Sequence, residues 1–366
     1  MTLNRGACRA MAVSVVFLST INTAPPGAMA DYVRDSQWHL KSLRIAEAHQ
    51  ITRGAGVTVA VIDSGVAAGH PDLVGAVLKG SNVLGDGGDG RQDLGGHGTA
   101  MAGIIAARGR GVGRGLLGIA PEADILPIRP GDDTALTIDA IDWATKNGAD
   151  VVNMSFAVDA APQLQEALRK AVAADVVLVG SAGNSGNGSN EVEFPAAYPE
   201  VLAVGAVDRR GRVASLSQRG PQVDLVAPGV EIPSLKLPAA YGLGTGTSDA
   251  AAIVSGAAAL VRARFPELSA AEVVERLTAT AKDRGPKGRD DAYGHGELDL
   301  MAALTAKVPT SAPSVPVPAV DQPVTAFPEG DASEPGISPF VIIGAGVVLL
   351  LGATTAAVLV ARRRRT

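Results

Sequence analysis

Four residues in this sequence could take part in catalysis, and they occur in the order Asp63, His97, Asn184 and Ser248. A histidine can accept the proton of a serine hydroxyl, and a carboxylate can fix the tautomer and orientation of the imidazole. A carboxamide can donate hydrogen bonds to an oxyanion that develops during the reaction. The set is therefore suited to acyl transfer through a serine nucleophile.

Each of the four also has an ordinary structural interpretation when taken alone. Asp63 ends an apolar run and could cap a helix, although a carboxylate in that place is costly without a specific partner. His97 stands between glycines before a run of small residues, where a helix is expected to begin. Ser248 could be the N-cap of the Ala-rich helix that follows, and Asn184 a turn asparagine. Only their combination favours chemistry.

Short apolar runs alternate with helical patterns through the middle of the chain, which predicts an α/β fold. The runs are too continuous in their apolar character for strands with one exposed face, so we expect a mostly parallel sheet with helices on both faces. The candidate residues then lie at the carboxyl ends of strands, where such folds place their sites. The predicted strands cover 57–62, 125–128, 151–154, 176–180, 201–207 and 224–227, and two of the predicted helices cover 135–147 and 162–174.

The motifs V-I-D-S-G, H-G-T-x-x-A-G, S-A-G-N and G-T-S-x-A-A follow one another in this order. Over about residues 31–307 the sequence resembles the subtilisin-like serine proteases of the S8 family. The resemblance implies a triad of Asp63, His97 and Ser248, with Asn184 in the oxyanion hole. It also implies that substrate is received by Ser155, Phe156, Ala157, Ala182 and Gly183.

A closer resemblance is to the mycosins, the membrane-anchored proteases associated with type VII secretion. It rests on the segment DSQWHLKSLRIAEAHQITRGAGVTVAVIDSGV, on FPAAYPEVLAVGAVD and on the layout of the chain. The resemblance implies cleavage of an exported protein or peptide, type VII membrane components as partners, and no required cofactor. It also implies that the N-terminal extension, residues 31–56, stays packed on the body rather than acting as a separate propeptide.

Three residues depart from the wider family. Asp249 follows the predicted nucleophile where relatives usually have an apolar residue, and Ala252 stands where they often have proline. Ala157 replaces a glycine that many relatives have in the substrate-binding strand, so we expect a narrower pocket. None of these changes removes a catalytic group, but Asp249 adds a charge beside the nucleophile.

The two ends of the chain predict export and anchoring. Residues 1–30 have the basic start, short apolar run and Ala-Met-Ala ending of a signal peptide. Residues 340–361 form a charge-free apolar span, and the basic tail 362–366 follows at once, which predicts a cytoplasmic C-terminus. The proline-dense segment 308–339 is expected to be an extended linker between this span and the peptidase domain. We therefore expect a single-pass type I protein of the cell membrane with residues 31–307 outside the cytoplasm.

Composition narrows the possible chemistry further. The chain of 366 residues carries 32 Lys and Arg against 37 Asp and Glu. Since six of the basic residues lie at the ends, the body is acidic, which argues against nucleic-acid binding. The single cysteine, Cys8, lies in the predicted signal peptide, so no disulfide or thiol chemistry is expected after its removal.

No metal site is assigned from the sequence. Asp86, Asp89 and Asp93 form an acidic stretch that does not match the EF-hand spacing, so structural calcium stays open. The other four histidines are expected on surfaces or in loops; they are His39, His49, His70 and His295.

Two functions other than a protease also relate to features of this sequence. The chain could mainly stabilise a membrane secretion complex, with weak or dispensable proteolysis, and the anchor and linker fit that role equally well. A lipase or esterase is disfavoured because it would need a G-x-S-x-G motif and the chain order Ser, Asp, His.

Overall fold

The computed structural model describes residues 32–85, 87–131, 133–188 and 190–308. The predicted signal peptide, transmembrane span and basic tail lie outside these residues, as does all of the predicted linker after Val308. None of the helices in the described part of the chain is both long and apolar enough to cross a membrane.

The centre of the described fold is a sheet of seven parallel strands in the order β2-β3-β1-β4-β5-β6-β7. Apolar, mostly β-branched runs form these strands, and the long ones are buried on both faces. The predicted α/β fold with a mostly parallel sheet is therefore confirmed. The strands are β1 (Thr58–Ile62), β2 (Ser81–Asn82), β3 (Asp124–Arg129), β4 (Val151–Met154), β5 (Val177–Ser181), β6 (Leu202–Val207) and β7 (Leu225–Pro228).

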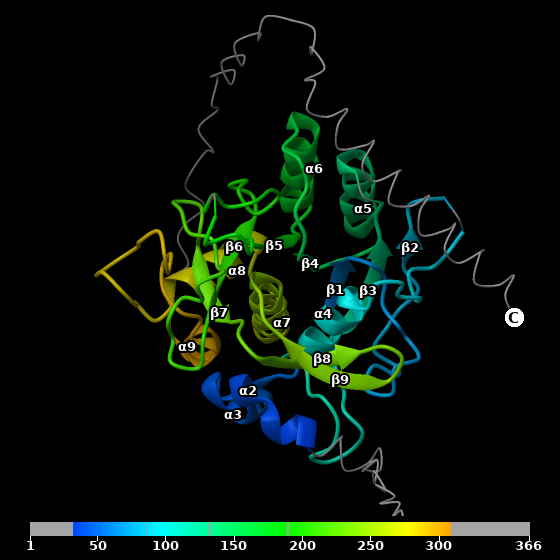
Figure 1. Cartoon of the computed structure of the whole chain (residues 1–366), viewed down its shortest axis with the longest axis horizontal. Helices are drawn as coiled ribbons and strands as arrows, with labels where there is room; N and C mark the ends of the chain where they lie inside the picture. The colour runs from blue at the N-terminus through cyan, green and yellow to red at the C-terminus, as the bar shows by residue number, and fades with distance from the viewer. Residues whose placement is uncertain (1–31, 86, 132, 189, 309–366) are drawn as a thin grey trace, which may run out of the picture. The chain divides into compact units, whose positions relative to one another are not determined.

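Helices cover both faces of the sheet and make two separate apolar cores (Figure 1). Side chains alternate between the faces along each strand, so Val59 and Val61 enter one core while Ala60 and Ile62 enter the other. Helices α5 (Thr134–Lys146) and α6 (Pro162–Ala173) pack on the second face. The first face carries α4 (His97–Ala106), α7 (Thr247–Arg264), α8 (Ala270–Ala279) and α9 (Leu300–Thr305).

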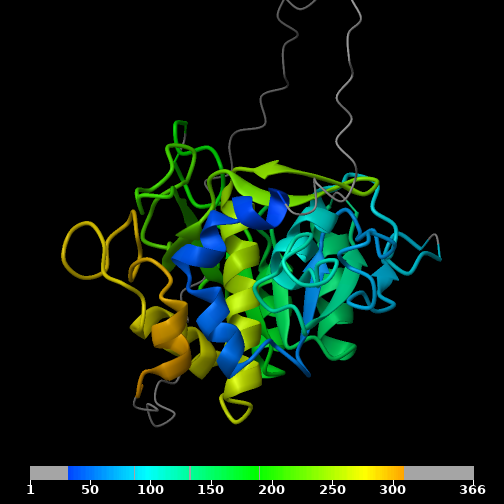
Figure 2. The ribbon, with the colours of Figure 1, turned by 90° about the horizontal axis from the view of Figure 1, so that it is seen from below.

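The N-terminal segment packs on the first face, with its helices α2 (Trp38–Ser42) and α3 (Ile45–Ile51) near α7 (Figure 2). Gln37 joins it to the body through two hydrogen bonds, one from its side-chain amide to the Leu117 carbonyl (2.8 Å) and one from the Leu117 amide (2.9 Å). The Trp38 indole donates to the carbonyl of Val230 at 3.3 Å. Residues 32–51 thus share the core of the body.

The expected placement of His39 on the surface or in a loop is wrong, because His39 is fully buried in α2. His70 lies in a loop, as expected, but is only 1% exposed. His39 stacks edge-on to Trp38, and the His70 Nδ1 atom accepts the Asp72 amide hydrogen at 3.2 Å. Both lie where the N-terminal segment or a neighbouring loop folds back over the body, a long-range contact that local polarity does not indicate.

The sequence did not predict an antiparallel hairpin of β8 (Ile232–Lys236) and β9 (Ala240–Gly244), which lies just before α7. Its strands contain Pro233, Gly242 and Gly244, residues that weaken a strand pattern. The hairpin is held instead by packing on α4, where Leu235 enters the first core. Its position brings β9 directly to the start of α7.

Candidate active site

The predicted site residues gather at the carboxyl edge of the sheet, around the strands β1 and β4. These strands are neighbours with Ile62 opposite Met154, so the next residues, Asp63 and Ser155, lie side by side. The chain leaves β1 toward β2 and β3 on one side, and leaves β4 toward β5 on the other. This divergence creates a crevice at the strand ends, the usual place for a site in a doubly wound sheet.

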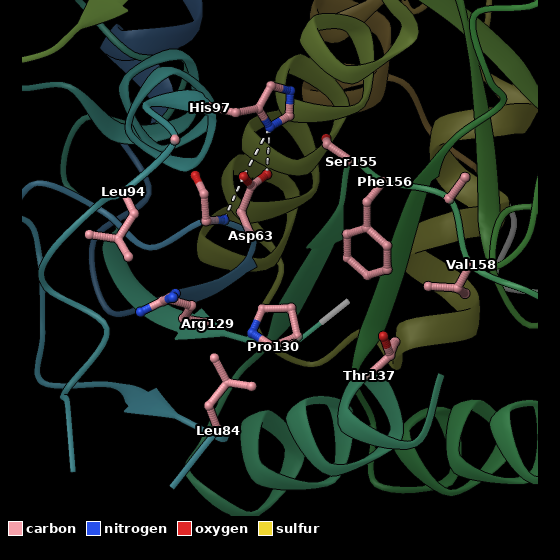
Figure 3. A pocket seen from close by; sticks show the side chains of 14 residues that line it. Asp63, Leu84, Leu94, His97, Arg129, Pro130, Thr137, Ser155, Phe156 and Val158 are labelled. Atoms are coloured by element: carbon pink, nitrogen blue, oxygen red, sulfur yellow. Dashed lines mark hydrogen bonds and ion pairs between the residues drawn. The ribbon is translucent and has the colours of Figure 1, made fainter. Parts of the chain in front are cut away.

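Asp63 and His97 form a bonded pair in this crevice (Figure 3). The His97 Nδ1 atom lies 2.8 Å from Asp63 Oδ2 and 3.0 Å from Oδ1. Because a carboxylate can only accept, Nδ1 carries the hydrogen and Nε2 is left as the acceptor. The Asp63 side chain is 6% exposed and that of His97 is 46% exposed, so the imidazole faces the crevice.

Gly98 allows α4 to approach β1 closely enough for this pair. A Cβ at Gly98 would lie 2.1 Å from the Gly65 carbonyl oxygen and 3.0 Å from the Asp63 Cβ. Any side chain here would push the start of α4 away from Asp63.

Asp93 anchors the start of α4 and was missed as a site residue. It was considered only as a calcium ligand, and its place three residues before the N-cap Gly96 gives no local capping signal. Its hydrogen bonds hold its own pKa below the usual value despite burial, which acts in the opposite direction. Oδ1 accepts from the Ser64 hydroxyl and the amides of Gly95 and Gly96, and Oδ2 accepts from the amide and the hydroxyl of Thr99.

Ser248 is the second residue of α7, so it is not the N-cap, which is Gly246. The Ser248 hydroxyl donates to the Ser155 carbonyl at 3.4 Å, and the Ser155 hydroxyl donates to the Ser248 carbonyl at 3.3 Å. The buried Asn153 extends this contact, since it donates to Ser155 and accepts from Ser255 of the same helix, both at 3.0 Å. The first turn of α7 is thereby fixed to the end of β4.

Asn184 follows β5 and contacts the start of α7. Its Oδ1 atom accepts from the Thr247 amide at 2.9 Å and from the Thr247 hydroxyl at 3.2 Å. The side-chain oxygen is therefore occupied, and the Nδ2 hydrogens of this exposed residue are turned away from Thr247. Asn184 lines the same cleft as Ser248 and His97.

Acidic side chains surround the imidazole of His97. Burial favours its neutral form, but the hydrogen bond and charge of Asp63 and the charges of Asp249 and Asp93 outweigh this and raise the His97 pKa. Asp249 is 4% exposed, and burial raises its pKa to about 7 although His97 and Lys236 favour its anion. The site thus holds two carboxyl groups close to the proposed base besides its bonded partner.

His97 lies between two clefts. The Phe156 cleft, of about 570 Å³, is lined by Asp63, Leu94, His97 and by Ser155, Phe156 and Ala157 (Figure 3). The Asp249 cleft, of about 630 Å³, is lined by His97, Asn184, Ser248, Asp249 and residues of the hairpin. Both are lined by residues from 63 to 249, so the N-terminal segment contributes to neither.

Two of the predicted substrate-binding residues lie behind these linings. Ala182 is fully buried in a third apolar cluster with Val192 and Val226. Gly183 is also buried, and its amide donates to the Thr247 hydroxyl at 3.1 Å. Through this hydrogen bond the buried segment holds Thr247, which in turn contacts Asn184.

No metal site emerges from the described residues: nowhere in them do three His, Cys, Asp or Glu side chains group so as to hold an ion. Asp93 is fully used in capping α4, and Asp89 accepts from the Arg91 amide at 3.2 Å. Asp86 lies outside the described residues.

Comparisons with known proteins agree with this geometry. A profile of the Subtilase family matches residues 54–296. Subtilisin DY of Bacillus licheniformis is 39% identical over 259 residues, which is 69% of this chain and 92% of that protein. The crystal structure of MycP1 from Mycobacterium smegmatis is similar, with a TM-score of 0.67 and 33% identity over 76% of this chain and 87% of that one. So is MycP3, a protease from the type VII (ESX-3) secretion system, with a TM-score of 0.65 and 34% identity over 78% of this chain and 90% of that one.

Proposed function

The chain belongs to the subtilase family of serine proteases, and we propose that it is a serine endopeptidase with Asp63, His97 and Ser248 as its catalytic triad. The observation that carries this assignment is the pairing of His97 Nδ1 with Asp63 at 2.8 Å. This pairing leaves Nε2 as an acceptor in the cleft that Ser248 also lines.

Catalysis begins when the Ser248 hydroxyl turns from the Ser155 carbonyl toward His97. Its oxygen bonds to the carbonyl carbon of the scissile peptide while His97 Nε2 takes the hydroxyl proton. Collapse of the tetrahedral intermediate breaks the C–N bond, and the same proton passes from His97 to the leaving amine. Water then repeats the sequence on the acyl-enzyme and releases Ser248. Asp63 keeps its charge throughout and stabilises the imidazolium.

The oxyanion is stabilised by the Nδ2 group of Asn184 and by the Ser248 amide. The contact with Thr247 sets the orientation of the carboxamide before substrate arrives. The Ser248 amide lies in the first turn of α7, where no intrahelical carbonyl is available to it. Both donors are thus preorganised for charge that appears only in the transition state.

Covalent labelling of the full-length chain with a fluorophosphonate serine probe tests the triad. Wild type should be labelled and Ser248→Ala should not. Ser185→Ala, which removes an exposed serine next to Asn184, is the matched control and should label like wild type. Labelling that survives Ser248→Ala would rule out Ser248 as the nucleophile.

We further propose that the protease is anchored in the cell membrane with residues 31–307 outside the cytoplasm, and that it cleaves an exported protein in type VII secretion. The sequence of the two ends and the likeness to MycP1 and MycP3 support this. In a Cys8→Ser background, Val112→Cys on a fully exposed side chain should react with an impermeant maleimide in intact cells. Thr366→Cys should react only after permeabilisation, and the reverse pattern would refute this topology.

The alternative is a chain that mainly stabilises a secretion complex. Ser248→Ala separates the two roles, because the hydroxyl is lost while the buried contacts of α7 remain. Secretion should stop in that variant if proteolysis is the function. Normal secretion with Ser248→Ala, together with loss of secretion when the chain is deleted, would show the structural role.

A further inference from the structure

The Asp249 cleft contains two buried polar groups for which the proposed reaction has no use. Asp249 is 4% exposed, and its Oδ1 atom has no hydrogen-bond partner among the described residues. Ser234 of β8 is 1% exposed, and its hydroxyl is likewise without a partner in the described part of the chain. Both line the cleft. Burying such groups is costly unless something completes their bonds.

The backbone around Asp249 makes room for its carboxyl group. A Cβ at Gly244 would lie 2.2 Å from Asp249 Oδ1, so the carboxyl group occupies the space that a side chain on β9 would fill. Lys236, on the paired strand β8, lies across the hairpin, since a Cβ at Gly242 would meet its Cε atom at 2.9 Å. Lys236 lines the same cleft and its charge favours the Asp249 anion, but no hydrogen bond or ion pair joins the two side chains among the described residues.

The position of the cleft identifies the part of a substrate that would enter it. If the acyl part of a peptide lies along Ser155–Ala157 in the Phe156 cleft, its carbonyl reaches Ser248 and its leaving part must continue past His97. The space on that side is the Asp249 cleft. His97 borders both clefts, as is required of a group that passes its proton to the leaving amine.

The Asp249 carboxyl group, which burial leaves only partly ionised near neutral pH, also affects the chemistry in its anionic form. An anion next to the developing oxyanion raises the energy of the transition state unless its charge is compensated. A cationic side chain in the cleft would compensate that charge and would complete the bonds of Asp249 Oδ1.

We propose that Asp249, with Ser234 beside it, selects a lysine or arginine side chain in the residue that follows the scissile bond. This inference rests on the proposed function, because it takes Ser248 as the acylated residue. It makes Asp249 a specificity-determining residue, not a member of the triad.

Acyl transfer to amino acid amides measures this preference directly. The full-length chain is acylated by a peptide ester, and the acyl-enzyme then partitions between water and an added amine. In the transfer, the α-amino nitrogen bonds to the acyl carbon, the bond to Ser248 Oγ breaks, and the amine proton passes through His97 to the Ser248 oxygen. The ratio of peptide to acid product depends on the cleft and not on the rate of acylation.

The matched pair of nucleophiles is argininamide and citrullinamide, which share shape but differ in charge, since citrulline has a neutral urea with a carbonyl oxygen in place of one guanidinium nitrogen. Wild type should prefer argininamide by about tenfold, the ratio typical of a charge-assisted bond over a neutral one. Asp249→Asn should reduce the preference to about twofold or less. Asp89→Asn, the same charge change outside the cleft, should keep the wild-type ratio.

An equal ratio for the two amides in wild type would overturn the inference even if Asp249→Asn failed to fold. A preference kept by Asp249→Asn, or lost in Asp89→Asn, would overturn it as well. Failure of the proposed function has a different signature: neither the ester nor a fluorophosphonate would modify Ser248.

Discussion

Replacing Asp93 by asparagine should weaken the site although Asp93 is outside the proposed triad. The carboxylate accepts five hydrogen bonds, three on Oδ1 and two on Oδ2. An asparagine presents NH₂ to one of these two groups of donors. The backbone amides of that group, one or two of them, then lose their acceptor and face a donor, while the hydroxyl can turn to accept. Since lost caps and bonds to charged acceptors each cost about 1–3 kcal/mol, we expect a loss of about 2–4 kcal/mol of stability.

The functional consequence follows from the position of His97 at the first residue of α4. Without the anchor, the imidazole loses its alignment with Asp63 and with the cleft. A displacement of about 1 Å at such a group can cost about 10²-fold in rate, so kcat should fall by that order while KM changes little.

The pH dependence of the rate separates a direct effect from simple destabilisation. Asp93 is one of the acids that raise the His97 pKa. Because His97 must be neutral to accept a proton, the acid limb of kcat/KM follows this pKa. Removal of the Asp93 charge should lower the His97 pKa, so the acid limb of kcat/KM should move to lower pH. Loss of folded protein alone would leave the limb in place.

The assays are thermal unfolding in a Ser248→Ala background, which prevents self-digestion, and pH–rate profiles in the active protein. One kcal/mol shifts Tm by roughly 2–4 °C in a domain of this size, so Tm should fall by roughly 5–15 °C. Asp89→Asn is the control, since the Asp89 side chain accepts a single bond within the described residues, from the Arg91 amide at 3.2 Å. Equal Tm, kcat and acid limb in Asp93→Asn and Asp89→Asn would refute the reasoning.

Three further predictions concern stability and catalysis. Burial lowers the pKa of His39 to about 3, so below pH 6.5 the unfolded chain binds a proton that the folded chain does not. The free energy of unfolding therefore decreases as the pH decreases, by about 2–3 kcal/mol at pH 4.5. His39→Phe should flatten this dependence in urea melts at pH 4.5 and 7.5, and an unchanged slope would count against burial of a neutral ring. Gly98→Ala should lower kcat by about 10²-fold because its Cβ meets the Gly65 carbonyl. The control Gly69→Ala should keep the wild-type kcat, since a Cβ there meets nothing within 4 Å. Equal kcat values for the two variants would contradict the steric argument. Asn184→Ala should lower kcat by about 10²–10³-fold with KM nearly unchanged, and a normal kcat would remove Asn184 from the oxyanion hole.

Local sequence patterns were sufficient for six of the seven strands of the central sheet and for α5 and α6, but the two-residue β2 was not predicted. The run 151–154 was predicted with the bounds that β4 has, and the other predicted strands differ by one or two residues. Continuous apolar runs of this length have few alternatives to a buried parallel strand, since helices need longer patterns. The hairpin was missed because its Pro and Gly residues weaken the pattern, and its stability comes from packing on α4.

The order of the motifs also placed Asp63, His97, Asn184 and Ser248 at strand ends and helix starts, because the short flanking runs allow few other positions. Chemistry-bearing residues at the carboxyl ends of parallel strands necessarily approach one another. The sequence by itself therefore determined six strands of the sheet, the family and the residues to assign to the chemistry.

Only the tertiary structure decided which other groups position these four residues or change their pKa values. The local sequence indicates only that Asp93 is a possible calcium ligand. Its five hydrogen-bond donors come together only in the folded chain, where the loop 93–99 packs against Ser64. Asn153 and His39 are polar residues in apolar surroundings whose partners, or lack of partners, depend on elements far away in the chain. The Asp249 cleft exists because β9 approaches α7 at Gly244, a distance that no local pattern encodes. Chain segments specify their own conformation, but burial and charge at a site depend on which segments meet there.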